Sequence, residues 1–62
     1  MFGRRVRKLR EALGESQDAF ALRVGLGRSY FGRVERGEVN VSLETIERIA
    51  KGLKVKLATL LE

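Results

Sequence analysis

The stretch RSYFGRVERG, residues 28–37, combines three arginines with a glycine in the pattern of a short helix. Arg28, Arg33 and Arg36 carry guanidinium groups, whose forked N–H donors fit phosphate oxygens and the edge of guanine. A helix that served only the core would carry neither these charges nor Gly32, because a mid-helix glycine costs about 1 kcal/mol relative to alanine. The residue types therefore predict a helix that presents donors to a polyanion and approaches it closely at Gly32.

The spacing places four residues of this stretch on one helix face. At 3.6 residues per turn, the four positions fall within about 140° of arc. They are Arg28, Ser29, Gly32 and Arg33. Phe31 and Val34 point the other way, as expected of residues that pack into a core.

Composition restricts the chemistry that the chain can perform. The 62 residues include 13 lysines and arginines and 8 aspartates and glutamates, and the formal net charge of +5 suits nucleic acid as a partner. With no cysteine and no histidine, disulfides, thiol or imidazole catalysis and the usual zinc sites are excluded. We expect one domain of residues 1–62 with no metal and no cofactor. Apolar runs fall short of the ~20 residues of a membrane span, so we expect a cytoplasmic protein.

Apolar spacing and capping residues predict an all-α fold, a compact bundle of five short helices. The expected ranges are about 2–13, 17–24, 28–36, 43–53 and 57–61. Ser16 and Ser42 are expected N-caps, and Gly14 and Gly25 are expected helix ends. The expected core consists of apolar residues at helical spacing: Phe2, Val6, Leu9, Leu13, Phe20, Ala21, Val24, Phe31, Val34, Leu43, Ile46, Ile49, Ala50 and Leu53.

The second and third expected helices form a motif. Each has about eight residues, and a short turn containing Gly25 and Leu26 joins them. This is the helix-turn-helix arrangement, over about residues 16–36, in which the second helix enters the DNA major groove and the first crosses the backbone.

The run SQDAFALRVGLGRSYFGRVERGEVNVSLETIERIA resembles the DNA-binding domain of the Cro and phage-repressor type, often called the XRE family. Glycines, caps and core positions match that family in register over nearly the whole chain. The resemblance implies a lambda-repressor-like fold whose third helix contacts the operator. It also implies a buried ion pair between Arg10 and Glu35 that locks the first helix to the third.

The resemblance also assigns DNA contacts. It puts four residues at base-facing positions: Arg28, Ser29, Gly32 and Arg33. It puts a second set against the phosphate backbone: Gln17, Arg36, Gly37 and Asn40.

Five positions depart from the family pattern by losing a cap, a proline, an apolar residue or a helix-ending glycine: Glu15, Gly27, Val41, Lys54 and Lys56. Each change removes a local interaction that typically stabilises a protein by about 0.5 to 2 kcal/mol. Gly52 is expected to replace part of the loss by ending the fourth helix early.

The leading hypothesis is a sequence-specific, double-stranded-DNA-binding transcriptional repressor that acts as a homodimer on a palindromic operator. Its alternative is an antitoxin-like module that binds a partner protein and regulates itself through the same DNA-binding face. An enzyme is not expected, because so small a domain lacks a cleft and an arguable acid–base pair. Leu22, Val39 and Val41 look like exposed single apolar residues, although Val39, Val41 and residues 57–61 are also candidates for a subunit contact.

Overall fold

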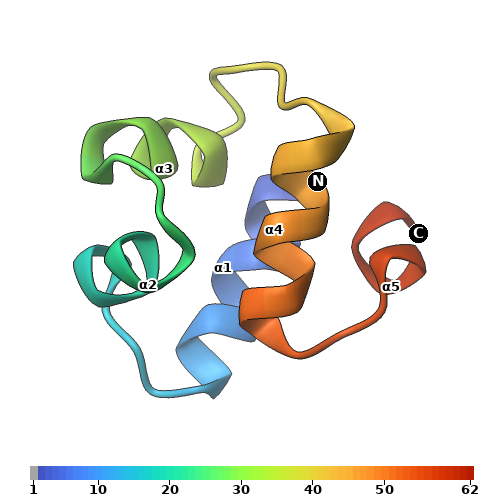
Figure 1. Ribbon diagram of the computed structural model, residues 1–62, viewed down its shortest axis with the longest axis horizontal. Coiled ribbons are helices and arrows are strands. Elements are labelled where there is room, and N and C mark those ends of the chain that lie inside the picture. The colour runs from blue at the N-terminus through green and yellow to red at the C-terminus, as the bar shows by residue number, and fades with distance from the viewer. Residues whose placement is uncertain (1) are drawn as a thin grey trace.

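The computed structural model describes residues 2–62, and it has five helices and no strand within them. The helices are α1 (Phe2–Ala12), α2 (Gln17–Val24), α3 (Arg28–Glu35), α4 (Leu43–Leu53) and α5 (Leu57–Leu61). Figure 1 shows α1 and α4 in the middle, with α2 and α3 on one side and α5 on the other. The predicted all-α bundle of five short helices is confirmed.

Helix boundaries follow the expected capping signals. The Ser16 hydroxyl accepts a hydrogen bond from the Ala19 N–H at the start of α2, and the Ser42 hydroxyl accepts one from the Thr45 N–H at the start of α4. Gly25 ends α2 in the left-handed region at φ 76°, where an L side chain is strained. Local chemistry therefore fixes both ends of α2 and the start of α4 at their predicted places.

The core lies where the helices converge, and its centre is the contact between Phe20 of α2 and Phe31 of α3, with ring centroids 5.1 Å apart. Two predicted core residues are wrong. Leu13 is 42% exposed because it follows the last residue of α1, and Leu43 is 59% exposed because it begins α4 next to the cap. Leu22 is exposed as predicted.

Val39 and Val41 differ from expectation in the opposite direction. Both are half-buried and pack against the core. The connection from α3 to α4 therefore lies against the bundle, and its apolar side chains help to cover the core.

The prediction that Gly52 ends the fourth helix is wrong. α4 continues to Leu53, and Lys54 follows in the left-handed region at φ 62°. Gly52 instead lies at the contact between α4 and α2, where a Cβ atom would overlap Val24 Cγ1 and come within 3.1 Å of Phe20 Cζ. Its lack of a side chain permits close helix packing.

Glu15 has a stabilising contact of its own in place of the family's apolar residue. The Arg23 guanidinium donates to both Glu15 carboxylate oxygens, at 2.8 and 2.6 Å, and also to the Gly52 carbonyl at 2.7 Å. Arg23 thereby ties the α1–α2 turn to α4, and it holds the pKa of the Glu15 carboxyl below its usual range. Because folding lowers this pKa, the pair stabilises the fold at neutral pH, and the contribution is lost as pH falls through the folded value.

Replacing Lys54 by glycine should stabilise the protein. A non-glycine residue pays about 1 to 2 kcal/mol in the left-handed region, and glycine offsets part of that gain through the greater freedom of its unfolded chain. We expect Lys54→Gly to raise the free energy of unfolding by about 0.5 to 1 kcal/mol in urea titrations. Lys54→Ala is the matched control, because it removes the charge and keeps the Cβ atom. An equal gain from Lys54→Ala would contradict the backbone explanation.

Candidate nucleic-acid interface

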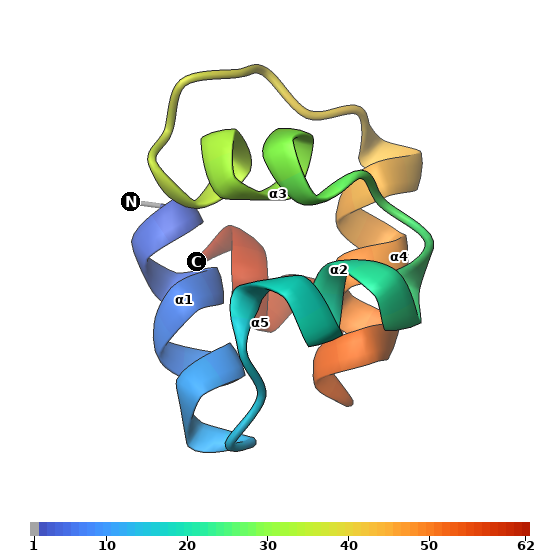
Figure 2. The same ribbon diagram turned by 90° about the vertical axis from the view of Figure 1, so that its left-hand side faces the viewer.

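α2 and α3 form the predicted helix-turn-helix on one side of the molecule, the side that faces the viewer in Figure 2. Between them, the Leu26 N–H donates to the Ala21 carbonyl at 2.9 Å, and the Leu26 side chain packs against the core. Gly27 precedes α3 without a side-chain cap. The orientation of α3 therefore depends on tertiary contacts more than on capping.

The outer side of this motif is a shallow hollow of about 330 Å³. The residues that line it are Gln17, Asp18, Arg28, Ser29, Gly32, Arg33 and Arg36. The structure thus brings together all four predicted base-facing residues and two of the predicted phosphate contacts. Gly37 and Asn40 lie apart from this hollow, in the connection that follows α3, where they line a second hollow described below.

Gly32 forms part of the floor of the hollow and, unlike the other three predicted base-facing residues, is buried, whereas Arg28, Ser29 and Arg33 are exposed. A Cβ atom at Gly32 would lie 3.3 Å from Arg36 Nη1 and 3.4 Å from Gln17 Oε1. Glycine at this position therefore lets the side chains of Gln17 and Arg36 lie across α3.

The predicted pair between Arg10 and Glu35 is present and buried, with the two residues 7% and 8% exposed. Arg10 Nε donates to Glu35 Oε2 at 2.6 Å, and Arg10 Nη2 donates to Glu35 Oε1 at 3.1 Å. This carboxylate raises the pKa of the Arg10 guanidinium above its usual value. Since α1 carries Arg10 and α3 carries Glu35, the pair fixes α3 to the body of the domain.

Two further hydrogen bonds extend the ion pair into a network. Gln17 Nε2 donates to Glu35 Oε1 at 2.8 Å, and Arg10 Nη1 donates to the Glu15 carbonyl at 2.8 Å. Glu35 therefore orients Gln17, the first residue of α2, as well as Arg10. The Gln17–Glu35 contact gives no local sequence signal, since 18 residues separate the partners.

Two carboxylates that the sequence-based prediction overlooked hold arginines of the surface. Asp18 Oδ2 accepts from Arg28 Nη1 at 3.2 Å, and Glu38 accepts from Arg36 at 2.9 and 3.3 Å. The second pair lowers the pKa of the Glu38 carboxyl and raises that of the Arg36 guanidinium. Arg33 has no ion-pair partner within residues 2–62.

A family model described as a helix-turn-helix domain matches residues 1–62. The chain belongs to this helix-turn-helix family. The resemblance to XRE-type regulators found in the sequence is thereby confirmed, together with the architecture around α2 and α3.

Named relatives of this helix-turn-helix protein include control proteins and transcriptional regulators. Control protein C.MunI of Mycoplasma sp is 42% identical over 60 residues, which cover 95% of this chain and 81% of that protein. The crystal structure of the restriction-modification controller protein C.AhdI from Aeromonas hydrophila is 49% identical, with a TM-score of 0.91 over 95% of this chain and 89% of that one. The biofilm regulator SinR, solved in complex with DNA, is 32% identical, with a TM-score of 0.93 over the full length of both chains.

Loss of Glu35 should destabilise the whole domain. Breaking a buried pair leaves an uncompensated charge, which typically costs about 3 to 5 kcal/mol. We expect Glu35→Ala to lose stability of that order in thermal and urea unfolding, and Arg10→Ala to behave alike. Glu47→Ala removes an exposed carboxylate of α4 that has no ion-pair partner within residues 2–62, and it should change little. Losses below about 1 kcal/mol from both Glu35→Ala and Arg10→Ala would show that the pair does not hold the fold together.

Proposed function

We propose that this helix-turn-helix protein is a sequence-specific regulator of transcription that acts as a repressor on double-stranded DNA. In the proposal residues 1–62 bind a palindromic operator as a homodimer, with α3 in the major groove. The single observation that carries the proposal is the hollow over α2 and α3. There, four residues of α3 lie beside the first turn of α2: Arg28, Ser29, Gly32 and Arg33. Family membership and the names of the relatives support the same function.

Bases are contacted from the exposed face of α3 in this proposal. Arg28 at the N-terminal end and Arg33 further along can each present a bidentate fork to guanine O6 and N7. Ser29 supplies a hydroxyl that both donates and accepts. Gly32 is buried beneath the side chains of Gln17 and Arg36, so in the proposal these two side chains move to the phosphates and the helix backbone at Gly32 then comes near the base edges. Both arginines are exposed, so they reach a groove without rearrangement of the core.

Phosphate contacts flank the base-reading face in the proposal. Gln17 uses one amide N–H for Glu35 and retains a second for a phosphate oxygen, at a helix N-terminus that itself favours anions. Arg36, Gly37 and Asn40 follow the end of α3, where the chain leaves the groove and runs along the backbone. These contacts supply affinity and register but carry no sequence information.

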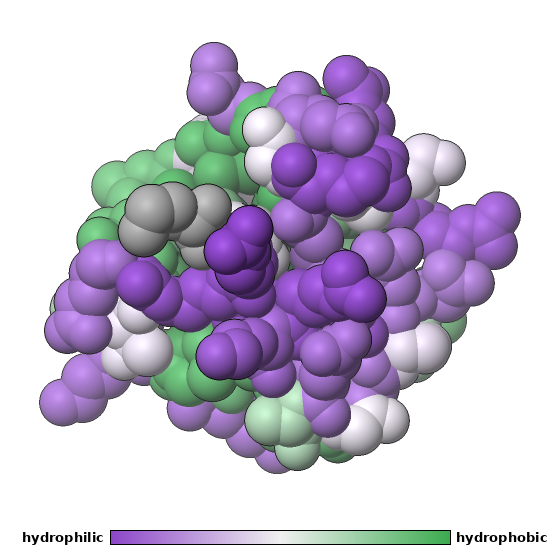
Figure 3. Space-filling view, turned by 180° about the vertical axis from the view of Figure 1, so that it is seen from behind, coloured by the Kyte–Doolittle hydropathy of each residue, from purple (hydrophilic) through white to green (hydrophobic). Residues whose placement is uncertain are grey.

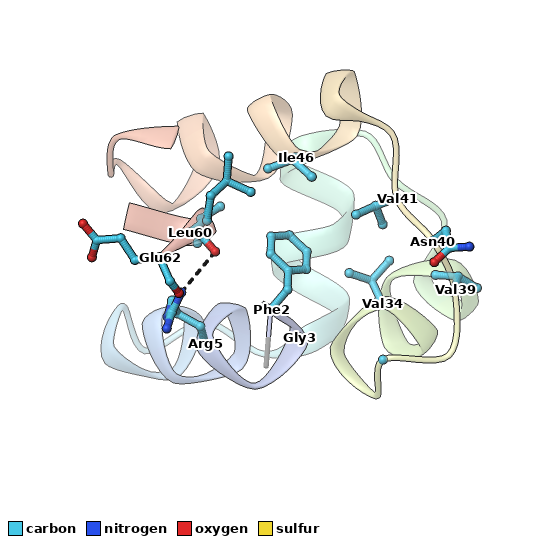
Figure 4. A pocket seen from close by; sticks show the side chains of 12 residues that line it. Phe2, Gly3, Arg5, Val34, Val39, Asn40, Val41, Ile46, Leu60 and Glu62 are labelled. Atoms are coloured by element: carbon cyan, nitrogen blue, oxygen red, sulfur yellow. Dashed lines mark hydrogen bonds between the residues drawn. The ribbon is translucent and has the colours of Figure 1, made fainter. Parts of the chain in front are cut away.

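Dimerisation is proposed at the second hollow, of about 440 Å³, between α1, α5 and the α3–α4 connection, where apolar side chains are joined by Arg5, Asn40 and Glu62. In Figure 4, the Phe2 ring points into this hollow, toward Ile46 and Leu60, with Val41 on its other side. From behind, the surface is largely hydrophilic, and its hydrophobic atoms gather toward the side on which α5 lies (Figure 3). A single recognition helix contacts few base pairs, so two subunits with half-sites about 34 Å apart would provide the specificity.

The antitoxin-like alternative would use the same hollow to bind a partner protein. The named relatives are control proteins and a transcriptional regulator, and none is named as an antitoxin, which favours the first proposal. None of the helices within residues 2–62 has the length and apolar character needed to cross a membrane.

Base-reading and phosphate-binding arginines should respond differently to substitution. Arg28→Ala and Arg33→Ala should each lose about 1 to 3 kcal/mol of discrimination at particular G·C pairs. Arg36→Ala should weaken binding to every sequence alike and lower the log–log salt slope by roughly 0.9. Titrations against a sequence selected from random DNA and its single-base variants measure both effects. A uniform loss from Arg28→Ala and Arg33→Ala, with no base position singled out, would show that this face does not read bases.

Replacing an apolar side chain of the second hollow by a carboxylate should prevent dimerisation. Leu61 lines that hollow yet is largely exposed, so Leu61→Glu should leave the monomer folded and shift sedimentation toward the monomer. Leu22→Glu is the matched control, since Leu22 is an exposed leucine of α2 outside the hollow. Footprinting should show paired half-sites for the wild type and weaker occupancy for Leu61→Glu. Sedimentation of the wild type as a monomer at high concentration, with single unpaired footprints, would exclude the dimer.

A further inference from the structure

We propose that Asp18 is a positioning residue for sequence specificity, which holds Arg28 toward guanine and keeps it from phosphate. The inference rests on the proposed function. It concerns a residue that neither the family pattern nor the sequence analysis assigned to the DNA-binding surface. It starts from the ion pair between Asp18, which lies in the first turn of α2, and Arg28, which is the first residue of α3.

The geometry allows Arg28 to bind Asp18 and a guanine base at the same time. Arg28 Nη1 donates to Asp18 Oδ2 at 3.2 Å, which uses one of the five N–H groups of the guanidinium. Two of the remaining groups suffice for a bidentate contact with guanine O6 and N7. Asp18 can therefore stay bound while Arg28 contacts a base. The ion pair also restricts the directions in which the remaining N–H donors of the guanidinium point.

A phosphate contact differs from a guanine contact in charge. Because the Asp18 carboxylate lies 3.2 Å from Arg28 Nη1, a phosphate bound to the same guanidinium would lie close to a second negative group, whereas guanine O6 and N7 are uncharged acceptors. Like charges repel, and they do so in every nonspecific complex that uses Arg28 as a phosphate contact. Asp18 thus favours complexes in which Arg28 meets guanine over complexes in which it meets the backbone.

The chain contains a contrasting pair at the other end of α3. Glu38 holds Arg36 at 2.9 and 3.3 Å, but Arg36 is the proposed phosphate contact. Neutralising Glu38 should therefore free Arg36 for phosphate on all sequences alike. Both pairs are exposed, so opening either one costs little free energy. In the proposal, the two carboxylates differ in the kind of DNA contact that their arginine makes.

A merely structural role for Asp18 is a competing explanation. A carboxylate in the first turn of α2 also interacts favourably with the helix dipole, so its loss lowers stability slightly. Such a loss would change the melting temperature but would leave the order of preference among bases untouched. The decisive measurement is therefore base preference, with thermal stability measured beside it.

The experiment uses a duplex selected by the wild type from random DNA, a panel of its single-base variants, and a random-sequence duplex. Asp18→Asn should reduce discrimination at the base pair that Arg28→Ala also singles out by at least about threefold, part of the roughly 5- to 150-fold that a bidentate arginine–guanine contact supplies. It should also strengthen binding to the random-sequence duplex. Asp18→Glu, which keeps the carboxylate, should restore most of the discrimination.

Three controls separate the possible outcomes. Glu38→Gln should strengthen binding to all duplexes equally. Glu47→Gln on α4, an exposed carboxylate without an ion-pair partner within residues 2–62, should show the smaller effect of removing a charge elsewhere. In an Arg28→Ala background, Asp18→Asn should cause no further loss of discrimination. Unchanged base preference in Asp18→Asn, while Arg28→Ala still singles out a base pair, would overturn the inference and leave the proposed function standing. Failure of the wild type to select any sequence would overturn the proposed function itself.

Discussion

The structure depends on the buried ion pair between Arg10 and Glu35, because it joins the first helix to the helix that carries the functional surface. A carboxylate and a guanidinium removed from water require hydrogen bonds on nearly every polar atom. Here the Glu35 oxygens accept from both Arg10 and Gln17, while Arg10 also donates to the Glu15 carbonyl. No buried side-chain nitrogen or oxygen lacks a partner within the described part of the chain. One set of contacts therefore fixes α3, the start of α2 and the end of α1 together.

This constraint explains how so short a helix holds its position. α3 has eight residues and an N-cap without a side chain, and isolated helices of that length are unstable in water. Phe31 and Val34 bury its inner side, and α1 approaches its C-terminal end closely at Gly3, where a Cβ atom would overlap the carbonyl oxygens of Val34 and Glu35. Packing and the ion pair thus replace the capping interactions that the sequence lacks.

The sequence predicted features that depend on neighbours in the chain. Ser16, Gly25 and Ser42 mark helix ends through contacts within four residues, so their effects are visible in the sequence alone. The Arg10–Glu35 pair, whose partners are 25 residues apart, was predicted only through the family resemblance, and other features that depend on distant partners were wrong or overlooked. Gly52 looked like a helix end, but its role is to admit Val24 and Phe20 of α2, and the loss expected at Glu15 disregarded Arg23, which is eight residues away.

The same distinction applies to the candidate site. Helical periodicity placed Arg28, Ser29 and Arg33 on one exposed face, where the structure has them. Periodicity alone could not place the residues that control these arginines, because Asp18 meets Arg28 only once the turn at Gly25 has folded α2 against α3.

The formal charge of +5 also gives an incomplete description of the surface that would meet DNA. Two of the three arginines in residues 28–37 have a carboxylate within 3.2 Å, so the field over α3 is weaker than a count of basic residues suggests. Arg33, in the middle, is the one without such a partner among residues 2–62. If every basic residue contributed fully to phosphate binding, the regulator would be bound mostly to the large excess of nonspecific sites in a genome. Paired arginines reduce that general attraction while they keep their donors available for base edges, so the charge pattern of this surface suits discrimination better than raw affinity.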